Sequence, residues 1–277
     1  MKRRSTTNWI GLVAGLALAC ASPGGSGDAD TADGAGEAGE EPTPGATEEA
    51  AGAAGEAHNT LTEAERAAGW RLLFDGETLA GWRAYASEMP PEGWRAEDGA
   101  LHRFASGGDI MTVDQFDGFE LSLEWKVPEG GNSGIFYHGR TGYDYIHDVA
   151  PEMQVLDDEG HADGGDPLTS AGAVYGLYPA PRGVVRPAGE WNRARIIVRG
   201  DHVEHWLNGK RIVEYELGSE DWNERVADSK FAGTDYGRFR SGHIGLQDHG
   251  DPVWYRNIKL LPIAEGASEA DPVGDGS

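Results

Sequence analysis

Residues 120–127 read ELSLEWKV, and apolar and polar side chains alternate strictly along this stretch. Its apolar positions are Leu121, Leu123, Trp125 and Val127. A period of two predicts a β-strand with one face in a hydrophobic core and the other in solvent. Similar short runs occur at 194–198, 203–207, 243–247 and 253–260. The run at 203–207 reaches Asn208–Gly209, a strong signal for a tight hairpin, and residues 211–216 return from it.

Helical signals are few in this sequence. One short helix is predicted from Leu61 to about Ala68, because Thr60 and Glu63 have the spacing of a capping box. The strands do not alternate with helices, and the sequence contains no internal repeat. Many short strands of this kind favour two packed antiparallel sheets. The sequence therefore predicts an all-β sandwich or jelly roll with a short N-terminal helix.

The composition limits what this chain can bind. Its 277 residues include 23 Lys and Arg and 47 Asp and Glu, which gives a formal net charge of −24. We expect no nucleic-acid partner, since that affinity comes from neutralising phosphates with basic side chains. The single cysteine excludes an intramolecular disulfide framework and a zinc site built from several cysteines.

The beginning of the chain has the pattern of an export signal. Residues 1–20 combine basic residues with an apolar run from Trp9 to Ala19, too short for a helix that crosses a bilayer and typical of a secretory signal. The run ends at Cys20 and resembles a bacterial lipobox, in which the cysteine is acylated after cleavage. We therefore expect a lipoprotein of the cell envelope. Ala21, rather than Asp, follows the cysteine and favours the outer membrane.

Three further segments follow the signal peptide. Residues 21–60 are almost entirely Ala, Gly, Glu, Asp, Ser, Thr and Pro, and residues 265–277 share this composition. Such segments cannot bury enough apolar surface to offset the entropy of ordering the chain. We expect a disordered acidic tether over 21–60, one folded domain over 61–264 and a disordered acidic tail.

A first group of candidate site residues lies in PEMQVLDD, residues 151–158. A period of two puts Glu152 and Gln154 on one face of a strand, and Asp157 joins them if the strand bulges near Leu156. A row of carboxylate and amide groups does not suit a core face. An ordinary solvated outer face remains the alternative.

A second group lies in HIGLQDH, residues 243–249. His243, Gly245 and Gln247 share one face, and Gly245 leaves room for a ligand or another strand. His249 follows the strand, where it suits a general base or a metal ligand, although a lone histidine is more often structural.

A third group lies in NSGIFYH, residues 132–138, where Asn132, Gly134 and Phe136 share one face. Amides, carboxylates and aromatic rings together suit sugar recognition, since hydroxyls need hydrogen-bond partners and C–H faces need rings. The neighbouring side chains that extend such a groove are Tyr143, Tyr145, His161 and Tyr175.

Seven segments occur in the order LLFDGETLAGW, GNSGIFYH, PEMQVLDD, AGAVYGLY, GEWN, EHWLNG and GHIGLQDHGDPVWYRNIKL. Together they resemble the family once called DUF1080, now described as the 3-keto-disaccharide hydrolase, or 3-keto-glucoside 1,2-lyase/3-keto-2-hydroxy-glucal hydratase, domain. The resemblance extends from about Trp70 to Leu261. It implies a concanavalin-like jelly roll with a sugar-binding groove on the concave sheet, and a periplasmic or surface role in bacterial saccharide breakdown.

The implied reaction uses a ketone on C3 of a glucoside, which acidifies the C2–H bond. Removal of that proton expels the group on C1, and water then converts the resulting glucal to the free 3-keto sugar. The expected catalytic residues are Glu152, His249 and Asp157, with His249 or Glu152 as the base. The expected substrate-binding residues are Asn132, Tyr137, Gln154, His161, Tyr175 and Gln247.

The sequence is also compatible with a metal ion and with two other functions. No motif requires a cofactor, although a divalent metal held by His249 and Glu152 would polarise the enediolate. The expected partners are a saccharide substrate and, through the lipid anchor, the membrane. The spacing Glu152-x-Gln154-x-x-Asp157 is also similar to the strand of retaining β-glucanases, which need two carboxylates about 5–5.5 Å apart. A lectin-like module that binds sugar without turnover is the other alternative, because a fold does not fix a function.

Overall fold

The computed structural model describes residues 58–85, 87–89 and 91–264. Cys20, the signal peptide, the acidic tail and most of the expected tether lie outside these residues. Asn59 belongs to the fold and not to a tether, because its side chain donates to the carbonyl of Gly99 at 2.7 Å and its backbone N–H donates to Asn257 at 2.6 Å. Within the described part of the chain, no helix is long and apolar enough to cross a membrane.

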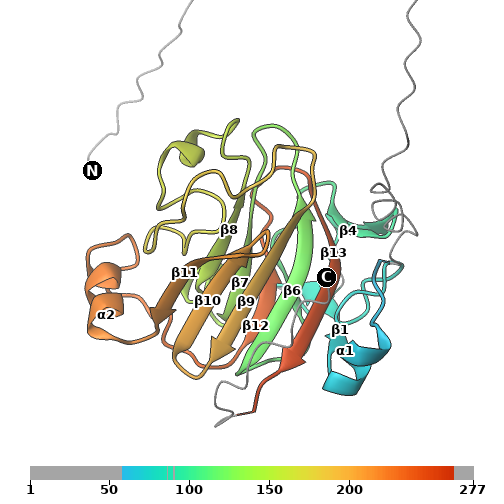
Figure 1. The fold of residues 1–277 in the computed structure, drawn as a ribbon, viewed down its shortest axis with the longest axis horizontal. Helices are drawn as coiled ribbons and strands as arrows, with labels where there is room; N and C mark the ends of the chain where they lie inside the picture. The colour runs from blue at the N-terminus through green and yellow to red at the C-terminus, as the bar shows by residue number, and fades with distance from the viewer. Residues whose placement is uncertain (1–57, 86, 90, 265–277) are drawn as a thin grey trace, which may run out of the picture. The chain divides into compact units, whose positions relative to one another are not determined.

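Two antiparallel sheets pack face to face and confirm the predicted all-β jelly roll (Figure 1). The larger sheet has the order β11 (Lys210–Glu216), β10 (His202–Leu207), β9 (Asn192–Arg199), β6 (Phe119–Lys126), β13 (Val253–Pro262), β4 (Ala100–Arg103) and β3 (Trp94–Glu97), with β1 (Arg71–Leu72) also paired to β13. The smaller sheet has the order β2 (Trp82–Ala84), β5 (Ile110–Thr112), β12 (His243–Leu246), β7 (Asn132–Gly139) and β8 (Glu152–Leu156).

The core lies between the two sheets, and β6 shows why the sequence folds this way. Leu121 and Leu123 of β6 pair with Ile196 and Ala194 of β9, and all four side chains are buried. The alternation in 120–127 is thus confirmed as one buried and one outward face. Four inward-facing residues of the smaller sheet meet this core, namely Ile135, Tyr137, Met153 and Val155.

Tyr137 therefore does not lie on the face where sugar binding was expected. Its side chain is fully buried between the sheets, and its hydroxyl lies 3.0 Å from His205 Nε2 and bonds the hydroxyl of Tyr215. The reason is the strand period, since Tyr137 alternates with Phe136 and points to the opposite side of β7. Tyr137 is a core residue.

The N-terminal helix α1 spans Glu63–Ala68. Its capping box is formed by Thr62 and Glu65, two residues after the expected pair of Thr60 and Glu63. Thr62 Oγ1 accepts from Glu65 N at 3.1 Å, and the Glu65 carboxylate accepts from Thr62 N at 2.7 Å. Gly69 ends the helix in the left-handed conformation. The sequence thus predicts the helix but not the residue at which it begins.

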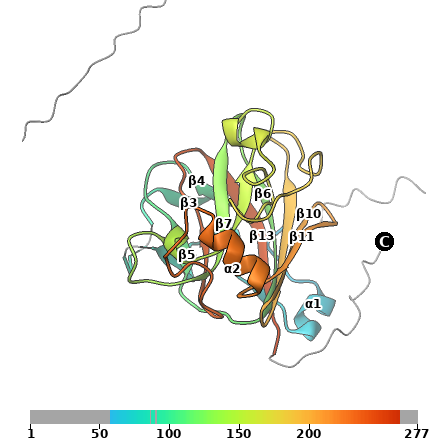
Figure 2. The same ribbon diagram turned by 90° about the vertical axis from the view of Figure 1, so that its left-hand side faces the viewer.

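A second helix, α2 (Glu220–Ala227), was not predicted from the sequence. Ser219 caps it by accepting from Trp222 N at 3.1 Å. The Trp222 ring stacks on Tyr215 of β11 at 5.1 Å and on Tyr236 at 6.0 Å. This aromatic stack holds α2 beside the edge of the sandwich, which faces the viewer in Figure 2. Two short 3₁₀ turns, η1 (Ile146–Asp148) and η2 (Ala162–Gly165), complete the secondary structure.

Candidate functional site

The outward face of the smaller sheet carries the polar residues that the sequence singled out. Glu152 and Gln154 of β8 pair with Phe136 and Gly134 of β7, and Gln247 N donates to the carbonyl of Gly134 at 3.0 Å. Because paired residues in antiparallel strands share a face, Gln154, Gly134 and Gln247 form one row across the sheet. Glu152 stands in the neighbouring row, on the same face.

Glu152 is the most unusual group on this face. Its side chain is 5% exposed, and among the described residues no donor makes a hydrogen bond to its carboxyl group. The absent side chain at Gly134 provides its space, since a Cβ there would lie 2.7 Å from Glu152 Cδ. Burial raises the pKa of Glu152 to about 8. The positive charge of Lys230 lowers this pKa, and the negative charge of Asp109 raises it further. Glu152 is thus a neutral acid at pH 7.

Three amide groups near this acid have unused hydrogen-bonding capacity. The side-chain oxygens of Asn132, Gln154 and Gln247 are buried and have no partner within the described part of the chain. The Gln154 amide is held by its Nε2, which donates to the carbonyl of Thr169 at 3.1 Å. Buried polar atoms are normally paired, so three unpaired ones on one face indicate a place where a polar ligand binds.

Asp109 is a second carboxyl group at this site, and the sequence analysis missed it. It precedes β5, whose Ile110 pairs with Leu246, and its Oδ1 accepts from Asp248 N at 2.9 Å. Burial raises the Asp109 pKa to about 6; the hydrogen bond from Asp248 N opposes the rise and the Asp248 charge adds to it. No sequence signal marks Asp109, because a single Asp before a three-residue strand is common in loops.

Lys230 supplies the cation of the site and was also missed. It follows α2, and its Nζ lies 4.2 Å from the centre of the Tyr175 ring. Tyr175 is held beside the acid by its backbone N–H, which donates to the carbonyl of Glu152 at 3.1 Å. Lys230 is exposed and makes no ion pair within 4.0 Å among the described residues. Its charge is available to a bound ligand.

The structure brings His161 and His249 together. Their rings meet edge to face at 6.4 Å. His161 precedes η2 and caps it by accepting from Asp163 N at 3.1 Å, and His249 is exposed. Among the described residues, the group of three His, Asp or Glu ligand atoms that lie within 4.8 Å of one another is on the larger sheet, and Glu152 and His249 are not part of it.

Asp157 was expected beside Glu152 only if the strand bulges near Leu156, and the pairing of β7 with β8 continues without a bulge as far as Leu156. Leu156 is buried in the core, and the chain then turns so that the Asp157 carboxylate accepts from the backbone N–H groups of Gly130 at 2.8 Å and Glu159 at 3.3 Å. The Asp157 carboxylate holds two loops together. This is a structural role in place of the expected catalytic one.

Gly245 also has a different role from the expected one. A Cβ at this position would lie 2.5 Å from Ile146 Cδ1, so the space above Gly245 holds η1 and not a ligand. The second buried cluster on this face consists of Tyr85, Met111, Phe136, Ile146 and Ala150. It covers part of the smaller sheet, so the polar site lies beside it, along the row of Gln154, Gly134 and Gln247.

The remaining sequence candidates lie around this cluster. Tyr143 and Tyr85 line a cavity of about 410 Å³ beyond it, together with Arg83. Tyr145 is 58% exposed and stacks on His147 at 5.0 Å. His243 is buried, and its Nδ1 lies 2.7 Å from the carbonyl oxygen of Thr112. None of these contacts involves Glu152.

Comparison with known proteins agrees with this architecture. Residues 69–261 match the family described as the 3-keto-alpha-glucoside-1,2-lyase-like domain. A protein of Bacteroides thetaiotaomicron named 3-keto-disaccharide hydrolase is 38% identical over 178 residues, which cover 56% of this chain and 61% of the relative. The match thus spans about three fifths of the length of that relative.

Solved structures of Parabacteroides distasonis proteins have the same fold. One candidate glycosyl hydrolase superposes with a TM-score of 0.70 at 33% identity, over 75% of this chain and 100% of the other. A second has a TM-score of 0.56 at 31% identity, over 70% of this chain and 99% of the other.

Proposed function

Because the chain belongs to the family of 3-keto-alpha-glucoside-1,2-lyase-like domains, we propose that it is a carbohydrate-active enzyme that cleaves 3-keto-glucosides, 3-keto-disaccharides among them. The name of the Bacteroides relative supports a hydrolytic net reaction. The match covers only part of that relative, so the site itself must support the chemistry.

The observation that carries the proposal is the pair of carboxyl groups with separated pKa values. Glu152, with a pKa of about 8, is protonated at pH 7, and Asp109, with a pKa of about 6, is ionised. Two acids that ionise at different pH on one face provide a proton donor and a proton acceptor together. Elimination from a 3-keto-glucoside needs both.

The reaction proceeds in two stages. Asp109 removes the proton on C2, and the electrons of the C2–H bond form the enolate of the C3 ketone. The enolate then re-forms the ketone, a C1=C2 double bond appears, and the C1–O bond breaks while Glu152 gives its proton to the departing oxygen. Water then adds at C1 and a proton returns to C2, which yields the free 3-keto sugar.

The other residues of the face hold the substrate. The unpaired amide oxygens of Asn132, Gln154 and Gln247 accept hydrogen bonds from sugar hydroxyls. Lys230 stabilises the negative oxygen of the enolate, since a cation at a developing charge lowers the barrier. Tyr175, over whose ring Lys230 lies, offers a flat apolar surface for the sugar.

A retaining β-glucanase mechanism is not favoured by the geometry. It needs a second carboxylate about 5–5.5 Å from the first. The Asp157 carboxylate, which the sequence spacing suggested for this role, is bound to the N–H groups of Gly130 and Glu159.

We also propose that the enzyme acts in the cell envelope as a lipoprotein acylated on Cys20, with an acidic tether ahead of the folded domain and an acidic tail after it. The sequences of residues 1–60 and 265–277 support this assignment. Globomycin, which blocks cleavage of lipoprotein signals, should make the uncleaved precursor accumulate, and Cys20→Ser should abolish acylation. Normal processing of the Cys20→Ser protein to a mature form would contradict it.

The enzymatic proposal is tested with purified full chain and nitrophenyl glucosides, each with and without a ketone at C3. We expect nitrophenol release only from the 3-keto compounds, and a loss of about 10²–10⁴-fold in kcat for Asp109→Asn. For Glu152→Gln we expect a loss of the same size on 3-keto-disaccharides, whose departing alkoxide needs a proton. His249→Ala, which removes an exposed imidazole, should keep most of kcat.

Equal release from the unoxidised glucosides would overturn the proposed reaction. A large loss in His249→Ala with little loss in Asp109→Asn would instead make the histidine the base. Sugar binding without any release would identify a lectin-like module.

A further inference from the structure

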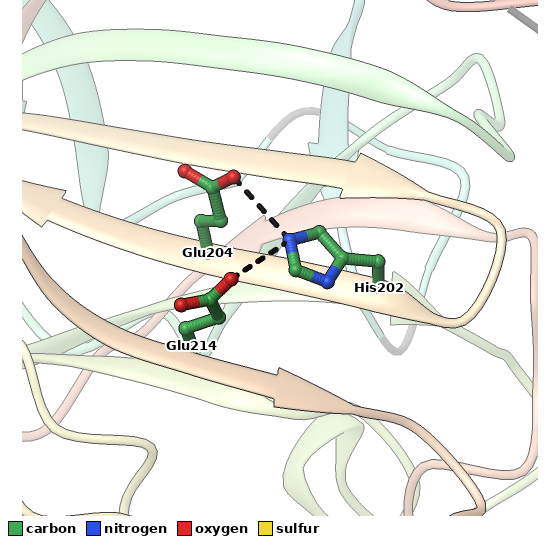
Figure 3. Close-up of side chains that lie close together, drawn as sticks. All are labelled: His202, Glu204 and Glu214. Carbon is green, nitrogen blue, oxygen red and sulfur yellow. Dashed lines mark hydrogen bonds and ion pairs between the residues drawn. The ribbon is translucent and has the colours of Figure 1, made fainter. Parts of the chain in front are cut away.

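A second cluster of polar side chains lies on the larger sheet, on its outward face. In the hairpin of β10 and β11, His202 is paired with Glu216, and Glu204 is paired with Glu214. The strand period places His202 and Glu204 opposite the core residue Val203. Figure 3 shows His202, Glu204 and Glu214 converging from these two strands.

Three electron-pair donors meet in this cluster. His202 Nε2 lies 3.3 Å from Glu204 Oε1 and 3.6 Å from Glu214 Oε1, and all three atoms lie within 4.8 Å of one another. Nitrogen and oxygen ligands about 2.0–2.2 Å from a tetrahedral Zn²⁺ are roughly 3.4 Å apart. The two distances from the imidazole thus fit neighbouring ligands of such an ion.

Each of the three side chains is also held through its other polar atom. Glu216 Oε1 lies 2.7 Å from His202 Nδ1, Trp206 Nε1 donates to Glu204 Oε2 at 2.5 Å, and Arg211 lies 3.2 Å from Glu214 Oε2. With Nδ1–H donated to Glu216, the lone pair of His202 Nε2 faces the two carboxylate oxygens. A carboxylate on the far nitrogen of an imidazole is the usual outer contact of a metal-binding histidine.

The charges of this cluster also favour a cation at its centre. Glu204 is 6% exposed and stands directly across from Glu214, and like charges in this position destabilise a sheet. Arg199 and Arg211 are 3.8 and 3.9 Å from Glu204 Oε1, too far for a direct hydrogen bond. A cation between Nε2 and the two Oε1 atoms would neutralise the pair.

We propose that His202, Glu204 and Glu214 bind a divalent transition-metal ion of the Zn²⁺ type. One imidazole and two carboxylates suit this class of ion better than Mg²⁺ or Ca²⁺, which take oxygen ligands. Two strands supply the ligands, so the ion ties the edge strand β11 to β10. β11 also carries Tyr215, on which Trp222 of α2 stacks. The ion therefore stabilises this edge of the sandwich, independently of the reaction proposed above.

The test is a titration of the tag-free full chain, stripped with EDTA, with ZnCl₂ at pH 7.5. We expect one equivalent of Zn²⁺ to bind and to raise the midpoint temperature of thermal unfolding. The affinity for Zn²⁺ should fall at least about 100-fold in His202→Ala and in Glu214→Gln. Trp206→Phe keeps the ligands but loses the bond to Glu204 Oε2, and should weaken binding about 10-fold. Co²⁺ in place of Zn²⁺ should give the visible absorption of a four-coordinate site.

Two control variants separate this site from others. Glu224→Gln removes an exposed carboxylate of α2 and should leave Zn²⁺ binding unchanged. His249→Ala removes the imidazole near Glu152, and loss of binding in this variant would place the ion there and overturn the proposal. Absence of Zn²⁺ binding to the wild-type protein would also overturn the proposal. The positive charge between the two carboxylates would then come from a protonated His202.

Discussion

Glu152→Gln should be more stable than wild type, and the difference in unfolding free energy between the two should grow as the pH rises. The size of this difference follows from the burial of the Glu152 carboxyl group. The pKa of Glu152 is about 8 in the folded protein and 4.5 in an exposed chain. Between these values the unfolded chain loses its proton while the folded protein keeps it. A raised acid pKa therefore costs stability above pH 4.5, and the cost grows until about pH 8.

Each pH unit in this window is worth about 1.4 kcal/mol. The cost is then about 3 kcal/mol at pH 7, and it grows by about 3.5 kcal/mol between pH 5 and pH 8. Gln has nearly the same shape and does not ionise. The difference in unfolding free energy between Glu152→Gln and wild type should therefore change with pH by this amount in favour of the variant.

The measurement is urea unfolding followed by tryptophan fluorescence at pH 5, 6.5 and 8. Glu224→Gln is the matched control, because its carboxylate is exposed on α2 and its replacement should give a difference that is the same at each pH. A Glu152→Gln difference that does not change with pH would refute the reasoning, since it would mean that Glu152 ionises alike in the folded and unfolded chains.

Three other predictions follow from the same geometry. The rate on a 3-keto-glucoside should be bell-shaped in pH, rising near pH 6 as Asp109 ionises and falling near pH 8 as Glu152 does; a rate that still rises above pH 9 would contradict these roles. Gly134→Ala should displace the Glu152 carboxyl and lower kcat at least 10-fold with stability within about 1 kcal/mol of wild type, as measured by turnover and urea unfolding. Tyr137→Phe should cost roughly 1–3 kcal/mol in urea unfolding, since it leaves core partners unpaired, but should leave KM unchanged; a raised KM would return Tyr137 to the sugar site.

The fold could be predicted from the sequence because its signals are local. The alternation in 120–127 and the Asn208–Gly209 turn each depend on neighbouring residues, and both predictions agree with the structure. The helix α2 was missed because its stability comes from distant contacts. Trp222 stacks on Tyr215 and Tyr236, and no local pattern shows that these rings meet.

The candidate site could be predicted only in part, for the same reason. Glu152 and Gln154 share a face because of the strand period alone, and the sequence analysis found them. Asp109 and Lys230 reach the site from a loop before β5 and a loop after α2, and only the register of the sheet and the packing of α2 bring them there. Asp157 failed as a prediction because the chain turns after β8, and the turn uses its carboxylate to hold backbone N–H groups.

The energetic cost of Glu152 is itself an argument for catalysis over simple sugar binding. A module that only binds sugar needs hydrogen-bond partners, and the amides of Asn132, Gln154 and Gln247 already provide them. Gln at position 152 would serve such a module at least as well, without the cost of a buried acid. An acid that stays protonated at pH 7 is useful where a proton must be given to a leaving group. Glu152→Gln should therefore bind a 3-keto-glucoside about as tightly as wild type in calorimetry while losing most of its release of aglycone; an equal loss of binding and turnover would show that Glu152 acts in binding and would contradict its role as the proton donor.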